Sequence, residues 1–122
     1  MEEIDLIFKR ALNLLEVAEF TLNNGFYPDS INRSYYAVYY GAKALLLKKG
    51  ITTKTHSGAI RRFNLEYVHK DTFNKEISEF FSKIEEHRKS VNYDVSFKST
   101  KTKAMKDLIN AKKFIKECEK FL

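Results

Sequence analysis

Apolar residues recur every three or four positions along almost the whole chain, the spacing that places them on one face of an α-helix. One Pro and four Gly interrupt this pattern, and between them we predict four long helices and one short one. The first predicted helix covers about 2–24, and the second runs from a cap at Asp29 or Ser30 to Gly50. The short third helix covers about 56–69. The fourth begins at Asp71 or Thr72 and ends at about 91, and the fifth covers about 102–122. The fold class is therefore all-α, an up-and-down helical bundle.

The second predicted helix has two different faces. Arg33, Tyr36, Tyr40 and Lys43 follow one another at spacings of three, four and three, and therefore share one stripe. These residues either pack in the core or bind a ligand. Core packing is the usual role of phenols on a bundle helix, with the hydroxyl hydrogen-bonded to a partner. Basic groups between aromatic rings are also what base stacking and phosphate contact require.

The opposite and lateral faces of this helix suit a central position. Tyr35, Val38, Ala42 and Leu46 form a mostly apolar stripe. The small residues Ala37, Gly41 and Ala44 lie beside the cationic stripe and would let another backbone approach closely. In the last helix we predict one shared register, which holds Met105, Leu108, Ile109, Lys112, Ile115, Cys118 and Leu122.

Arg88 interrupts the apolar face of the fourth predicted helix, where Ile77, Phe81 and Ile84 precede it at steps of four, three and four. A buried guanidinium needs a partner or an opening to solvent. It is therefore either paired with a carboxylate such as Asp94, or a planar donor for a phosphate group in a cleft.

Other polar residues near these helices give weaker indications. Tyr93 would point roughly 140° away from Arg88 in a continuous helix, so the two converge only if the helix ends between them. His56 and Ser57 are neighbours in sequence, which does not oppose a nucleophile and a base, and capping of the third helix is the expected role. His87 is expected to be exposed.

Composition narrows the possible functions. The 122 residues suffice for one domain, 1–122. The formal net charge of +6 favours an anionic partner, or reflects only a lysine-rich surface.

One Cys excludes a disulfide within the chain, and the three His lack the spacing of a zinc site, so no metal and no cofactor are expected. Without a signal peptide or a membrane-length apolar run, a cytoplasmic location is expected.

Three segments together resemble the HEPN superfamily, in particular its small prokaryotic members. They are the second-helix run from Arg33 to Leu46, the segment Lys54-Thr-His-Ser-Gly58, and His87-Arg-Lys-Ser-Val-Asn-Tyr-Asp94. The resemblance extends over nearly the whole chain. It implies a helical bundle that commonly forms a homodimer and is often the toxin partner of a minimal nucleotidyltransferase antitoxin.

Active members of this superfamily resemble metal-independent ribonucleases with an Arg followed, after four to six residues, by a His. Arg88 matches the Arg, but Tyr93, Asp94 and Val95 occupy the positions expected for the His. A phenol with a pKa near ~10 is a poor general base at neutral pH, so the departure argues against cleavage while leaving phosphate binding by Arg88 possible. Tyr93 is instead a candidate acceptor for nucleotidyl transfer from the partner.

Our first hypothesis is an RNA- or nucleotide-binding module whose cleft lies between the second and fourth helices. The residues predicted to line it are Arg33, Tyr36, Tyr40, Lys43, Arg88 and Tyr93. The alternatives are a ribonuclease in which Arg88 stabilises charge and Tyr93 or His87 moves the proton, and a purely structural dimerisation bundle.

Overall fold

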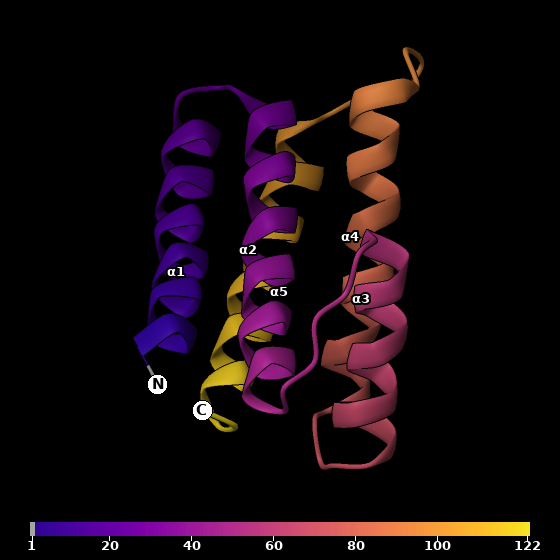
Figure 1. The fold of residues 1–122 in the computed structure, drawn as a ribbon. Coiled ribbons are helices and arrows are strands. Elements are labelled where there is room, and N and C mark those ends of the chain that lie inside the picture. Colours follow the sequence, from indigo (N-terminus) through magenta and orange to yellow (C-terminus); the bar gives the residue numbers. More distant parts are fainter. Residues whose placement is uncertain (1) are drawn as a thin grey trace.

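The computed structural model describes residues 2–122, which form five α-helices and one short π-helical segment and contain no strand. The elements are α1 (Glu2–Asn23), α2 (Tyr27–Lys48), α3 (His56–Phe63), η1 (Asn64–His69), α4 (Lys75–Tyr93) and α5 (Lys101–Glu119). Figure 1 shows α1, α2 and α4 side by side, with α5 behind α2 and α3 in front of α4. The predicted all-α bundle is confirmed.

Capping residues explain where the helices begin and end, and they correct several predicted boundaries. Gly25 and Gly50 follow α1 and α2 with φ of 83° and 73°, the left-handed conformation that glycine adopts without strain. Thr55 and Thr100 cap α3 and α5 by accepting backbone N–H groups three residues on. The capping role predicted for His56 and Ser57 is therefore wrong.

Two helix starts also differ from the prediction. Neither Asp29 nor Ser30 caps α2, which begins at Tyr27 because a proline is tolerated in the first turn of a helix. The buried Ser30 hydroxyl donates instead to the Ala18 carbonyl, 2.8 Å away. Helix α4 begins at Lys75 rather than near residue 71, because Asn74 caps it.

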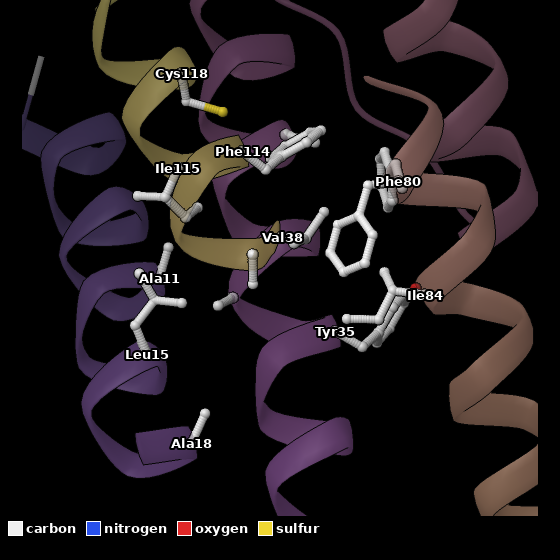
Figure 2. Packing of buried hydrophobic residues seen from close by; sticks show 14 of the residues in the cluster. Ala11, Leu15, Ala18, Tyr35, Val38, Phe80, Ile84, Phe114, Ile115 and Cys118 are labelled. Atoms are coloured by element: carbon white, nitrogen blue, oxygen red, sulfur yellow. The ribbon is translucent and has the colours of Figure 1, made fainter. Parts of the chain in front are cut away.

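Helix α2 is the centre of the bundle and packs against α1, α3, α4 and α5. Its predicted apolar stripe is buried, and so are the small residues Ala37, Gly41 and Ala44. A Cβ at position 41 would lie 2.5 Å from Cδ1 of Ile115, so glycine lets α5 approach this closely. The side chains around this contact are drawn in Figure 2, where Ile115 and Cys118 project from α5.

The apolar face of α5 was predicted only in part. Leu108, Ile115 and Cys118 are buried, but 40% of Met105, 47% of Ile109 and 44% of Leu122 is exposed. Lys112 is exposed as well. Alanines and Phe114 complete the buried face instead. The prediction took large apolar side chains as the buried face. Where a helix lies close to two neighbours, its small residues are the ones that become buried.

Four phenylalanines form the most apolar part of the core, where α3, α4 and α5 meet. Phe63 lies at the centre of this phenylalanine cluster, with ring centroids 4.8 Å from Phe73, 5.4 Å from Phe114 and 5.9 Å from Phe81. All four side chains are buried, and mixed edge-on and tilted ring geometries are those that aromatic pairs prefer. The cluster fastens the short α3 to the long helices.

Candidate functional site

An open groove of about 480 Å³ runs between α1 and α2. Arg33, Tyr36 and Tyr40 of the predicted cationic stripe line one wall of it. The facing wall is α1, which contributes Arg10, Asn13, Leu14 and Val17. The predicted cleft between α2 and α4 is therefore wrong in its second wall, because the stripe faces α1 and not Arg88.

Arg10 is the residue of this groove that sequence reasoning missed. Its guanidinium carbon lies 5.3 Å from the centroid of the Tyr40 ring, and Nη1 lies 3.5 Å from the Tyr40 hydroxyl. Lys43 is exposed, outside the groove lining, and its Nζ lies 5.8 Å from the same ring. Two arginines and two phenols thus face one open surface, where stacked bases and phosphate groups would find partners.

A second group of polar side chains lies where α2, α3 and α4 meet. We call it the polar cluster, and it consists of Tyr35, Tyr39, His56, Glu85 and Arg88. The Tyr35 ring is fully buried and points from α2 towards α4, as Figure 2 shows beside Ile84. The carbon at the centre of the Arg88 guanidinium lies 4.8 Å from the centroid of this ring.

Arg88 is paired with Glu85, one helical turn earlier, and not with Asp94 as one alternative suggested. Nε of Arg88 donates to Oε1 of Glu85 at 3.2 Å, and Nη2 makes a second, shorter bond to the same oxygen. Only 12% of the Arg88 side chain and 6% of the Glu85 side chain is exposed. Burial lowers the pKa of Arg88, but the bonds and charge of Glu85 outweigh it and raise that pKa overall.

His56, the first residue of α3, belongs to the polar cluster. Its Nδ1 is hydrogen-bonded to the Tyr35 hydroxyl and lies 3.6 Å from Oε2 of Glu85. Burial lowers the pKa of His56; Glu85 opposes this shift, while Arg88 and Lys89 add to it. The ring is therefore neutral at pH 7.

Tyr93 and His87 lie apart from the polar cluster. Helix α4 continues through Tyr93, whose side chain is 81% exposed, so Arg88 and Tyr93 are not brought together. His87 is partly buried rather than exposed, and its Nδ1 lies 2.9 Å from a carboxylate oxygen of the buried Asp107. This pairing ties α4 to α5, on a different side of α4 from Arg88.

Tyr36 connects the groove with the polar cluster. It lines the groove, while its ring centroid lies 5.0 Å from that of Tyr35 and 6.1 Å from that of His56. The two sites are therefore neighbouring parts of one surface along α2.

Two further observations concern metals and membranes. Within residues 2–122, His, Cys, Asp and Glu side chains form no group of three that could hold a metal ion. Over the same range, every helix is too short or too polar to cross a bilayer.

The comparisons with known proteins agree on one family. The sequence model of the HEPN domain matches residues 4–121. A UPF0332 protein of Thermotoga maritima is 36% identical over 116 residues, which are 93% of this chain and 81% of that protein. Two Methanocaldococcus jannaschii proteins, each named "Putative toxin", are 30% and 31% identical over 98% and 99% of this chain, and 82% and 90% of their own lengths.

Proposed function

The chain belongs to the HEPN family, and on that premise we propose that it is a toxin-like module that binds single-stranded RNA or a nucleotide. The groove between α1 and α2 carries the proposal, because Arg10 and Arg33 lie there beside Tyr36 and Tyr40. Cations beside exposed aromatic rings bind the phosphate backbone and stack on bases. The relatives named "Putative toxin" support the toxin-like role. The net charge of +6 supports an anionic ligand.

Arg33 offers the sharpest test, because its side chain is exposed and its replacement leaves the core intact. Binding of a labelled single-stranded RNA is measured by fluorescence anisotropy at several salt concentrations. The slope of log K against log salt is about −0.7 for each phosphate neutralised on a single strand. Arg33→Gln is expected to weaken binding and to reduce the magnitude of this slope by about 0.7.

Arg61 provides the matched control, since it is an exposed arginine on α3 outside the groove. Arg61→Gln is expected to leave the slope unchanged. Equal effects of the two substitutions would mean that RNA responds only to net charge, and no binding by wild type would refute the proposal. Arg88 belongs to the proposed site as a buried cation at its edge, where an anion must compete with Glu85.

A minimal nucleotidyltransferase is the proposed partner, with Tyr93 as the acceptor of a nucleotidyl group. The 81% exposure of Tyr93 at the last residue of α4 supports this assignment, because the hydroxyl is open to an enzyme. Mass spectrometry after incubation with such an enzyme and a nucleotide is expected to find the added group on Tyr93. Modification of Tyr93→Phe to the same extent would contradict the assignment.

Self-association into a homodimer is also part of the proposal. The side of α1 turned away from the core exposes Leu6 and Phe20, with 60% and 66% of these residues open to solvent. Exposed apolar residues that gather on one helix are typical of a protein interface. Light scattering at the elution peak gives the mass, and a dimer without any RNA binding would favour the purely structural bundle.

A further inference from the structure

Helix α5 exposes a face of one charge sign, which the proposed groove between α1 and α2 does not use. All six lysines of α5 are exposed, and we call their surface the lysine face. Two of the three acidic residues of α5, Asp107 and Glu117, are buried, and only Glu119 is exposed. Protein surfaces usually mix both signs, as α1 does with five acidic and two basic residues. Solubility alone therefore does not account for the lysine face.

Most charges of the lysine face have no counterpart within the chain. The side chains of four lysines form neither an ion pair nor a hydrogen bond among residues 2–122: Lys101, Lys106, Lys113 and Lys116. Lys112 is paired with Glu19 of α1 at 2.5 Å, but 47% and 53% of these side chains are exposed, and an exposed pair contributes little. A polyanion that binds here releases condensed counterions, and this release favours binding.

The lysines lie along both edges of the exposed arc of α5. At roughly 100° per residue, Lys101 and Lys112 share one edge, and Lys106 and Lys113 share the other, about 120° away. The ion pair of Lys112 with Glu19 places the first edge beside α1. Lys113 lines a cavity of about 330 Å³ together with residues of α4, which places the second edge beside α4. In Figure 1, α5 accordingly lies behind α2, with α1 on one side and α4 on the other.

Apolar side chains lie between these two lysine edges. Met105 and Ile109 fall midway along the arc and are 40% and 47% exposed. The core does not require them, because the opposite side of α5 supplies its buried residues. The lysine face is thus a ridge with an apolar middle and a cationic edge on each side. Its complement is a groove with anions along both borders.

Duplex DNA has a groove of these dimensions. The major groove of B-form DNA is about 12 Å wide and accepts an α-helix, whose diameter with side chains is about 10–12 Å. The 19 residues of α5 extend over about 28 Å, and a duplex carries one phosphate charge per ~1.7 Å of its axis. The major groove of A-form RNA is too narrow for such a helix, and a flat bilayer offers no borders for the two edges. Shape and charge together favour DNA.

We propose that α5 lies in the major groove of double-stranded DNA and that the lysines of its two edges bind phosphates of the two strands. Met105 and Ile109 then face the edges of the bases, where the thymine methyl group is an apolar partner. Lysine contacts to phosphate carry no sequence information, so binding is largely independent of sequence. The proposal does not rest on the RNA-binding function of the groove between α1 and α2.

Acidic residues limit the lysine face on both sides. Glu19 of α1 lies beyond the first edge, and Glu76 and Glu79 of α4 line the cavity beside Lys113. These carboxylates repel phosphate groups, so the bound duplex is confined to α5. Such borders favour a ligand that follows one helix over a ligand that spreads across the bundle.

Binding of a labelled DNA duplex to the full chain, measured by fluorescence anisotropy at several salt concentrations, tests the proposal. For B-form DNA the slope of log K against log salt is about −0.9 for each phosphate neutralised. Lys101→Gln/Lys106→Gln, with one substitution on each edge, is expected to weaken binding and to reduce the magnitude of the slope by about 1.8. Glutamine and lysine have similar helix propensities, so α5 is retained.

Lys54→Gln/Lys75→Gln is the matched control. It removes the same charge from two exposed lysines outside α5, and the slope should stay that of wild type. Equal effects of the two double variants would mean that DNA responds only to net charge, and this would overturn the proposal. The proposal is also wrong if wild type does not bind the duplex.

The single variants test the placement in the groove. Lys101→Gln and Lys106→Gln should each reduce the magnitude of the slope by about 0.9, because each lysine meets a different strand. A response to only one of them would refute this placement. Tighter binding of duplex RNA than of DNA, or binding of phosphatidylglycerol vesicles in the absence of any DNA binding, would contradict the choice of ligand.

Single-stranded RNA keeps the two binding proposals apart. The Lys101→Gln/Lys106→Gln variant should bind it with the wild-type slope, because the groove between α1 and α2 lies elsewhere. If wild type binds the duplex but not this RNA, the proposed function is wrong and the inference from α5 stands; the reverse result refutes only the inference. An equal loss of slope on both nucleic acids would mean that α5 attracts any polyanion, against its placement in the major groove.

Discussion

Two aromatic regions of this bundle differ in whether their side chains carry polar groups. The phenylalanine cluster places four rings where α3, α4 and α5 meet, and none of them carries a polar atom. The polar cluster lies at the other end of α3 and combines two phenols with an imidazole, a carboxylate and a guanidinium. Both regions hold α3 in place, but only the second retains groups that accept and donate protons.

The difference shows how one short helix serves both stability and chemistry. Phe63, near the end of α3, is fully buried, whereas His56 at its beginning remains partly open. An apolar contact holds the helix without any desolvation penalty for polar groups, because no group there requires a hydrogen bond. The polar contact is more demanding, since a buried charge that loses its partner is costly.

The largest expected effect tests the apolar side of this comparison. Phe63→Ala removes a ring that touches three other phenylalanines and leaves a cavity among them. We expect the free energy of unfolding to fall by about 3–5 kcal/mol in urea titrations. A loss below about 1 kcal/mol would mean that α3 is held chiefly by the polar cluster.

The next effect tests whether the polar cluster also stabilises the fold. Arg88→Ala leaves the buried Glu85 carboxylate without its partner, and we expect a loss of about 3 kcal/mol. The double variant Glu85→Gln/Arg88→Met removes both charges and should recover most of this loss. If Arg88→Ala costs no more than the double variant, the ion pair makes no net contribution.

The smallest effect is a dependence of stability on pH. Because the pKa of His56 is lowered in the folded protein, the unfolded chain binds the proton more tightly. The contribution of His56 to the free energy of unfolding is therefore complete above pH 6.5. It is lost as the pH falls towards the pKa of His56 in the folded protein. Urea titrations at pH 7.5 and 5.5 should show a smaller difference for His56→Gln than for wild type, and equal differences would argue against a lowered pKa.

Periodicity was sufficient to predict the regular parts of the molecule. The helical order, the central α2 and the burial of Tyr35 follow from local spacing, and so does the shared face of Arg33, Tyr36 and Tyr40. These features depend on residues close in sequence, for which the helical repeat is a direct guide.

The contacts between distant segments were not predicted. Arg10 meets Tyr40 across 30 residues, and His56 meets Tyr35 across 21, so no helical repeat connects them. Glu85 could have been found, since it lies one turn before Arg88 on the same helix. The π-helical geometry of η1 was not predicted, because the apolar spacing over 64–69 is compatible with an ordinary α-helix.

The close approach of α2 and α5 at Gly41 also bears on how this protein could diversify. Any side chain there would collide with Ile115, so the back of α2 tolerates little change. The front of the same helix, with Arg33 and Lys43, is open and carries no such restriction. Selection for a different ligand would therefore act on one surface of α2 while the other keeps the helices in register.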